Sequence, residues 1–142
     1  MKAEIIAVGS ELLTPFRVDT NSLFLTDELN KLGIEVIRKV VVGDDAGRLR
    51  EAFREALSRA EVVVASGGLG PTEDDLTREA VSELLGRKLQ RNDAILQHIQ
   101  ERFRRFGRAM PDTNARQADV PEGARALENS RGTAPGLWLE TA

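Results

Sequence analysis

Residues 62–77, VVVASGGLGPTEDDLT, decide the fold of this chain. Their unbroken apolar start is typical of a strand buried on both faces of a parallel sheet. Gly67, Gly68 and Gly70 follow, and glycine lets backbone N–H groups approach a ligand without side-chain interference. The next helix begins among acidic residues, and a helix N-terminus presents unpaired N–H donors. This strand–loop–helix order predicts an α/β fold with a phosphate-binding loop.

Two further strand–helix pairs precede this stretch. Residues 3–8 and 34–42 are apolar runs of strand length, and each is followed by leucines and alanines at helical spacing. We expect Asn21 to cap the first of these helices and Gly33 to end it. Strands that alternate with helices predict a three-layer α/β/α fold with a mostly parallel sheet.

Ligands of such sheets bind outside the carboxyl ends of the strands. The loops over residues 9–19, 43–45 and 67–75 all follow predicted strands. We therefore expect these three loops to share one crevice.

The remaining sequence predicts mainly helices. One helix is closed by Gly86, and a longer helix runs from a cap at Asn92 to Gly107 with Phe103 and Phe106 facing the core. Three late segments follow: a short helix over residues 112–118 and strands over 120–127 and 137–140.

The composition bounds the class of protein. With 142 residues, 41% of them hydrophobic and 30% charged, the chain suits one soluble globular domain. The absence of cysteine excludes disulfides and thiolate metal sites. The sequence shows neither a membrane span nor a secretory signal, so we predict a cytoplasmic protein without a membrane partner. A formal net charge of −3 argues against a nucleic-acid partner.

The glycine loop fits neither common nucleotide motif, because the Walker lysine and the third Rossmann glycine are missing. Asp74 and Asp75, at the following helix start, could serve the helix dipole alone, an effect of about 0.3–1 kcal/mol. A phosphate about 4 Å from a carboxylate is repelled by roughly 4 kcal/mol at an effective dielectric of about 20. A phosphate site here therefore needs a divalent cation such as Mg²⁺, which carboxylates and substrate phosphates commonly hold together.

Other acids follow the first two strands. Asp44 and Asp45 come after the second strand, where one of them can cap the helix and the other can bind the cation. Glu11 follows the first strand and faces the same crevice. The basic residues 102–108 are interpreted as the solvated side of an amphipathic helix, and His98 has no partner for catalysis.

Several motifs together resemble the N-terminal domain of the CinA family, the competence/damage-inducible proteins, which is related to the molybdopterin-binding proteins MoaB, MogA and MoeA. The glycine–proline–acid motif is quite specific to this group, and the resemblance runs over almost the whole chain, taken as one domain over residues 1–142. It implies a MoaB/MogA-like fold. The motifs are residues 9–13 (GSELL), 19–21 (DTN), 42–45 (VGDD), 67–77 (GGLGPTEDDLT) and 132–136 (GTAPG).

The resemblance to CinA implies a metal-dependent pyrophosphatase, a hydrolase that converts ADP-ribose to AMP and ribose 5-phosphate with Mg²⁺ or another divalent cation, aided by K⁺. The essential acids of the molybdopterin relatives match Asp44 and Asp75, and a family run near residues 114–118 makes Asn114 and Gln117 expected nucleotide contacts. The expected catalytic residues are Asp44, Asp75 and Glu11, and the expected metal ligands are Asp44, Asp74 and Asp75. The expected substrate- and phosphate-binding residues are Gly9, Ser10, Asn21, Gly67, Gly68, Leu69, Gly70, Thr72, Asn114 and Gln117.

The chain departs from the family pattern in three places. Pro15-Phe16 stands where Gly-Gln is usual, and Asp19 stands where Asn is common. The sequence also stops before a Pro-Gly-Pro segment and lacks the deamidase domain that follow in the family, so we expect it to be cut short at its C-terminus.

Two other functions remain open from the sequence. The same pocket could bind molybdopterin or transfer an adenylyl group in molybdenum cofactor biosynthesis. Alternatively, the chain could be a non-catalytic interaction module in competence or the DNA damage response. In each case the resemblance implies a homo-oligomer.

Overall fold

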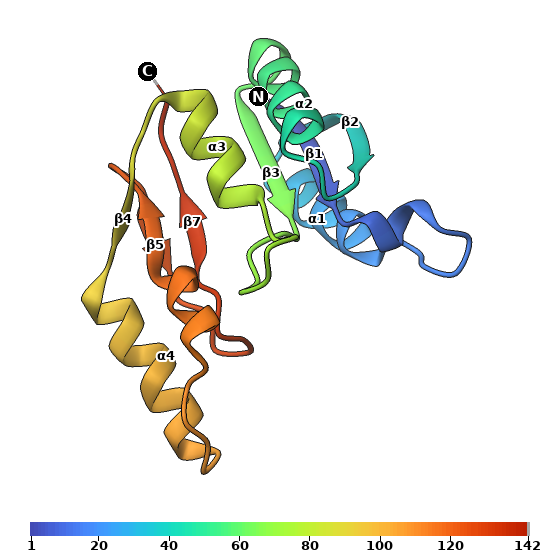
Figure 1. Ribbon diagram of the computed structural model, residues 1–142. Helices are drawn as coiled ribbons and strands as arrows, with labels where there is room; N and C mark the ends of the chain where they lie inside the picture. Colours follow the sequence, from blue (N-terminus) through green and yellow to red (C-terminus); the bar gives the residue numbers. More distant parts are fainter. Residues whose placement is uncertain (142) are drawn as a thin grey trace. The chain divides into compact units, whose positions relative to one another are not determined.

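The computed structural model describes residues 1–141, which divide into two compact units, Met1–Gly68 and a second that begins at Leu69 (Figure 1). The first unit holds a three-stranded parallel sheet in the order β2-β1-β3. Its elements are β1 (Lys2–Val8), the 3-10 helix η1 (Ser10–Leu13), α1 (Thr20–Lys31), β2 (Glu35–Val42), α2 (Ala46–Arg59) and β3 (Val62–Ser66).

The central strand β1 shows that helices cover both faces of this sheet. Ala3 and Ile5 are fully buried in one cluster with Leu29 of α1. The side chain between them, Glu4, is instead bonded to Arg59 of α2. Because neighbouring residues of a strand point to opposite faces, α1 and α2 lie on opposite sides of the sheet. This confirms the predicted α/β/α layering in the first unit.

Both helices of the first unit begin at an aspartate cap. The Asp19 side chain accepts a hydrogen bond from the backbone N–H of Ser22 at 3.0 Å, so the prediction that Asn21 caps α1 is wrong. Asp and Asn cap equally well, and the backbone leaves the helical conformation at the aspartate. Asp45 caps α2 by accepting from Arg48 N–H at 2.8 Å, which confirms that one of the two neighbouring aspartates has this role.

The second unit contains two helices and two small antiparallel sheets. Sheet β4-β5 packs against α3, and β6 pairs with β7. Its elements are α3 (Thr77–Leu85), β4 (Leu89–Arg91), α4 (Asp93–Arg105), the 3-10 helix η2 (Asp112–Ala118), β5 (Asp119–Pro121), β6 (Arg125–Leu127) and β7 (Gly136–Trp138).

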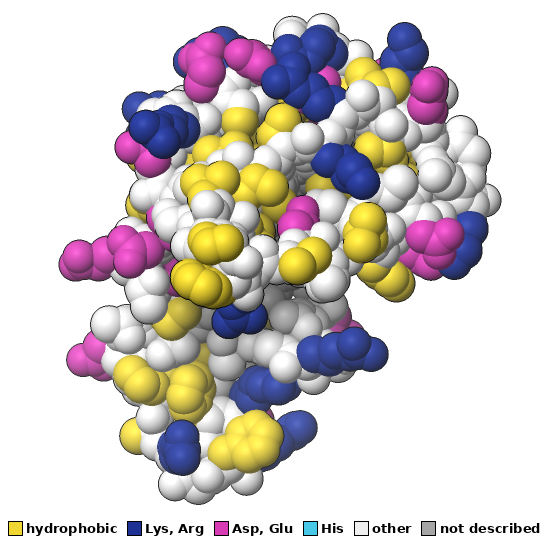
Figure 2. Space-filling model, turned by 90° about the vertical axis from the view of Figure 1, so that its right-hand side faces the viewer, with side chains coloured by type: hydrophobic (Ala, Val, Ile, Leu, Met, Phe, Trp, Pro, Cys, Tyr) yellow, Lys and Arg dark blue, Asp and Glu magenta, His cyan; other side chains and the backbone are white. Residues whose placement is uncertain are grey.

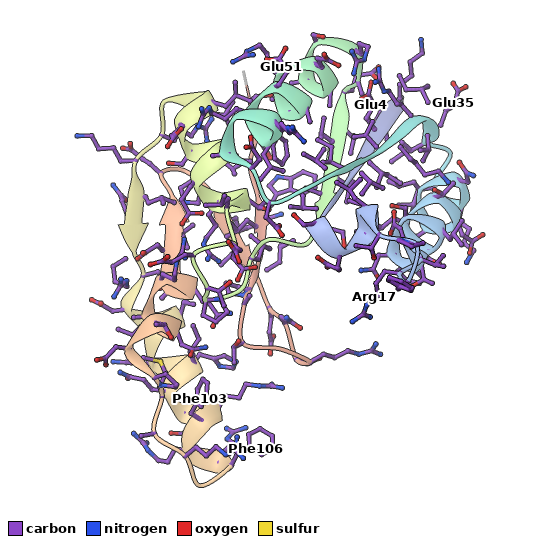
Figure 3. All side chains as sticks on the ribbon, turned by 45° about the vertical axis from the view of Figure 1, so that its right-hand side comes forward. Glu4, Arg17, Glu35, Glu51, Phe103 and Phe106 are labelled. Atoms are coloured by element: carbon purple, nitrogen blue, oxygen red, sulfur yellow. The ribbon has the colours of Figure 1, made fainter. Side chains whose placement is uncertain are left out.

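Three predictions for this unit need correction. The expected strand over residues 120–127 is two strands, because Pro121 has no N–H for the ladder and Gly123 turns the chain at φ 78°. Strand β4 was not predicted, since three residues are too few to show a period. Phe106 does not face the core: it follows the end of α4 and is 73% exposed (Figure 3).

The caps of α3 and α4 are as predicted. Asn92 accepts a hydrogen bond from Ile95 N–H at 3.0 Å, and Gly86 ends α3 in the left-handed conformation at φ 63°. No helix among residues 1–141 is long and apolar enough to cross a membrane.

Candidate functional site

The carboxyl ends of β1 and β2 are joined through Ser10 and Asp44. The Ser10 N–H donates to Asp44 Oδ2 at 3.1 Å, and the Asp44 N–H donates back to Ser10 Oγ at 2.9 Å. The Gly9 N–H also donates to the Val42 carbonyl at 2.9 Å. This reciprocal pairing fixes an acid and a hydroxyl at the end of the sheet, where ligands of parallel sheets bind.

Two glycines bring the neighbouring loops close to β1. Gly67 has φ 105°, and a Cβ at this position would overlap the carbonyl oxygen of Val8. Gly9 has φ 154°, and a Cβ there would lie 2.5 Å from Glu11 Oε1. Only glycine fits either position without a shift, so the Glu11 carboxylate folds over Gly9 and the loop after β3 lies against the end of β1.

A pocket of about 270 Å³ opens at this end of the sheet in the first unit. Its polar lining comes from Glu11, Arg17, Asp19, Asn21 and Ser66. The Asn21 amide donates to Ser66 Oγ at 3.1 Å and so ties the start of α1 to the end of β3. Of the three loops predicted to share a crevice, the loop after β1 and Gly67 line this pocket, whereas the loop after β2 is joined to them only through the Ser10–Asp44 hydrogen bonds.

Arg17 lines this pocket but was not among the predicted site residues. Figure 3 shows its side chain extending from the segment between η1 and α1. The sequence signal next to it is Pro15-Phe16, which stands where Gly-Gln is usual in the family.

The glycine–proline–acid loop of the second unit is held by Asp75. Its Oδ2 accepts the Thr72 N–H at 2.9 Å and the Thr72 hydroxyl at 2.7 Å. Burial raises the pKa of Asp75, but the hydrogen bonds from Thr72 and from the Gly70 backbone outweigh it, so the pKa lies below its ordinary value of 3.8. The Thr72 N–H predicted to hold phosphate is therefore bonded to the protein's own carboxylate.

Two arginines hold the carbonyl groups of the same loop. Arg78, only 2% exposed, donates to the Leu69 carbonyl at 2.7 Å and the Gly70 carbonyl at 2.9 Å. Arg116 donates to the carbonyls of Thr72 and Asp75, and it also pairs with Glu79. Sequence reasoning missed both residues, because an arginine inside a helix normally indicates a solvated face.

The remaining predicted residues are not among those that line the first-unit pocket. Gln117 is 2% exposed and accepts a hydrogen bond from the Asn114 amide at 2.9 Å, so both side chains are occupied inside η2. Their contact with a nucleotide stays a prediction. Asp74 is exposed on the loop, and Gly68 has φ 68° at the end of the first unit.

The carboxylates of the candidate site are chemically suitable ligands for a hard cation. Each carboxylate has about four lone-pair sites, and Asp44 uses one of them for Ser10, so lone pairs remain for an ion. Oxygen ligands are the type that Mg²⁺ takes. Within residues 1–141, no group of three or more His, Asp or Glu side chains is arranged around a common metal position.

The exposed charges do not form an extended basic surface on the face drawn in Figure 2. Basic and acidic side chains are interspersed there with hydrophobic ones. On α4, Arg104 and Arg105 are exposed and paired with Glu101, as expected for a solvated helix side.

Comparison with known proteins confirms the expected fold. Residues 4–142 match the family described as "Probable molybdopterin binding domain". A CinA-like protein of Solibacter usitatus is 59% identical over 140 residues, which cover 99% of this chain and 34% of that protein. The chain thus spans about a third of the length of the curated relatives it matches.

Solved structures agree with this assignment. The crystal structure of the protein CinA with unknown function from Thermoplasma acidophilum is similar, with a TM-score of 0.87 and 39% identity over 96% of this chain and 79% of that chain. A molybdopterin biosynthesis protein from Mycobacterium abscessus gives a TM-score of 0.56 at 25% identity, covering 75% of this chain and 65% of that one.

Proposed function

This chain belongs to the family of probable molybdopterin binding domains, in the group of CinA-like proteins, and we propose that it is a metal-dependent pyrophosphatase that hydrolyses ADP-ribose to AMP and ribose 5-phosphate. The observation that carries the proposal is the Ser10–Asp44 pair at the carboxyl ends of β1 and β2, adjacent in sequence to Glu11, which lines the polar pocket. It supports the proposal because a carboxylate with spare lone pairs lies at the carboxyl ends of parallel strands, the edge at which ligands of such sheets bind.

The chain's own residues would bind and orient the substrate. Asn21 and Ser66 offer amide and hydroxyl groups to the sugar, and Glu11 lies over Gly9 as an acceptor for a water molecule or a sugar hydroxyl. In the first unit, Asp44 would bind the divalent cation, and in the second unit Asp75 and Asp74 stay the predicted metal ligands. When bound, this ion would neutralise charge between carboxylate and phosphate and lower the pKa of a coordinated water.

The glycine loop of the second unit would hold phosphate through backbone N–H groups such as that of Thr72, which Asp75 accepts in the structure and would have to release. Arg78 binds two of its carbonyls, which removes these acceptors from the path of an anion. This supports a pre-formed loop, which lowers the ordering cost of binding.

The test is release of AMP from ADP-ribose in the presence of Mg²⁺. We expect Asp44→Asn to lower the rate at least about 100-fold, the size typical of a lost charged catalytic group. Asp45→Asn is the matched control: it removes a neighbouring charge, but asparagine still caps α2, so activity should stay within a factor of about two. Full activity of Asp44→Asn would refute the assignment.

Molybdopterin binding is the second candidate, favoured by the family description and by the molybdopterin biosynthesis protein among the similar structures. The two candidates share one pocket and differ in the ligand. Competition between ADP-ribose and a molybdopterin precursor, followed by isothermal titration calorimetry, separates them. Tighter binding of the pterin, without AMP release, would decide for the second.

A further inference from the structure

We propose that Arg17 binds a phosphate group of the ligand in the first-unit pocket and so selects phosphorylated compounds. This inference rests on the proposed function, because it names a contact within that same site. Among the described residues that line the pocket, Arg17 is the one with a positively charged side chain. The acids Glu11 and Asp19 line it as well.

Arg17 differs from three other arginines of the chain in having no hydrogen bond or ion pair to the described protein. Arg59 is bonded to Glu4, Arg78 to the Leu69 carbonyl, and Arg116 to Glu79. Arg17 is exposed, and within residues 1–141 no hydrogen bond or ion pair joins it to another residue. Its guanidinium therefore keeps all its donors for a ligand, and this planar group matches phosphate in a bidentate arrangement.

The neighbouring acids define which end of the ligand lies at Arg17. Asp19 is committed to the cap of α1, accepting from the N–H and the hydroxyl of Ser22. Glu11 folds over Gly9 and faces the ligand as an acceptor. Since a carboxylate repels phosphate, the phosphate should lie toward Arg17 and the donor groups of the sugar or ring toward Glu11.

The start of α1 adds to the same preference. Thr20 and Asn21, the first residues of this twelve-residue helix, line the pocket next to Arg17. A helix N-terminus carries partial positive charge and favours anions. The pocket lining thus combines positive charge from Arg17 and the start of α1 with the carboxylates of Glu11 and of Asp19, the latter already bonded to Ser22. This combination suits a phosphate ester that also carries hydroxyl or N–H donors.

The experiment measures binding of ADP-ribose, AMP and adenosine by isothermal titration calorimetry at low ionic strength. Arg17→Ala should lower the affinity for ADP-ribose and for AMP about ten-fold. The affinity for adenosine should stay unchanged, because adenosine has no phosphate. Arg17→Lys should recover part of the lost affinity, since lysine keeps the positive charge but lacks the bidentate N–H donors of the guanidinium. Arg54→Ala, which removes an exposed arginine paired with Glu51 on α2, is the matched control and should bind like the wild type.

The outcomes separate this inference from the proposed function. If Arg17→Ala binds AMP and ADP-ribose as tightly as the wild type does, the inference is overturned while the pocket assignment stands. An equal loss for adenosine would also overturn it, because the effect would then be on the pocket as a whole. If the wild type binds none of the phosphorylated probes, both proposals fail. Unfolding midpoints of all variants should be equal, since Arg17 makes no contact that the fold needs.

Discussion

Replacing Asp75 by alanine should destabilise the chain even in the absence of any ligand. In the structure, Asp75 Oδ2 accepts both the N–H and the hydroxyl of Thr72, at 2.9 and 2.7 Å. Hydrogen bonds to a charged group contribute about 1.5–3 kcal/mol when buried. Thr72 is exposed, so water replaces part of the loss. We therefore expect the free energy of unfolding to fall by about 1–2 kcal/mol.

The same carboxylate should contribute to the pH dependence of stability. Its folded pKa lies below 3.8, despite burial, because Thr72 and Gly70 donate hydrogen bonds to it. The unfolded chain therefore binds this proton at a higher pH than the folded chain does. The stabilisation is present above the unfolded pKa and is lost as the pH falls through the folded pKa. Asp75→Ala should thus flatten the loss of stability below about pH 4.

Urea unfolding followed by circular dichroism at neutral and acidic pH tests both effects. Thr72→Val is the matched variant, because it removes the hydroxyl and keeps the N–H. Together the two substitutions form a double-mutant cycle, and a coupling energy of about 0.5–1 kcal/mol is expected between residues in contact. An unchanged unfolding free energy in Asp75→Ala, at every pH, would refute this account of the loop.

Three further substitutions test the first unit. Gly67→Ala should lower the free energy of unfolding by at least about 2 kcal/mol, because the added Cβ would overlap the Val8 carbonyl oxygen at a φ of 105°. An unfolding temperature equal to that of the wild type would show that this position does not require glycine. Gly47→Ala, in the first turn of α2, has only an ordinary contact and should raise the unfolding free energy by up to about 0.5–1 kcal/mol; a lower urea midpoint would show hidden strain. Glu4→Gln should lower the free energy of unfolding by about 2 kcal/mol at neutral pH, since Glu4 is 1% exposed and its carboxylate pairs with Arg59 at 2.7 Å. The hydrogen bond from Arg59 lowers the Glu4 pKa, so this penalty should shrink as the pH falls below about 4.5, and a pH-independent difference would argue against the pair.

The alternating strands and helices could be predicted because strands buried on both faces of a sheet are unbroken apolar runs, and buried helices have apolar residues at helical spacing. The run before Gly67 and the stripe of α2 each follow from one dominant period. Short elements show no such pattern, and β4 has only three residues. Strand β5 ends at Pro121, within an apolar run that the sequence alone presents as one strand. Phe106 was misplaced because a helix period alone does not show that the helix stops at Arg105.

The sequence could predict the acids and glycines of the candidate site, but it could not predict the arginines. Asp44 and Gly67 stand in loops after strands, where topology gives them a common edge. Arg78 is buried by contacts with carbonyls of a loop, and backbone acceptors leave no signal in side-chain patterns. Arg17 lines the pocket only because the segment before α1 returns to the sheet, which its sequence does not specify.

If the proposed function holds, the hydrogen bonds of the two acids should also link phosphate binding to cation binding. Asp44 accepts the Ser10 N–H and Asp75 accepts the Thr72 N–H, so a phosphate oxygen that takes either donor must displace a carboxylate. A displaced carboxylate about 4 Å from phosphate adds roughly 4 kcal/mol of repulsion at an effective dielectric of about 20. A divalent cation between the two groups removes that repulsion, and linkage is reciprocal. ADP-ribose should therefore bind more tightly with Mg²⁺ than with EDTA, and Mg²⁺ should bind more tightly with ADP-ribose present. In Asp44→Asn combined with Asp75→Asn, this mutual dependence should largely vanish; equal ADP-ribose affinity of the wild type with and without Mg²⁺ would show that the carboxylates are not displaced.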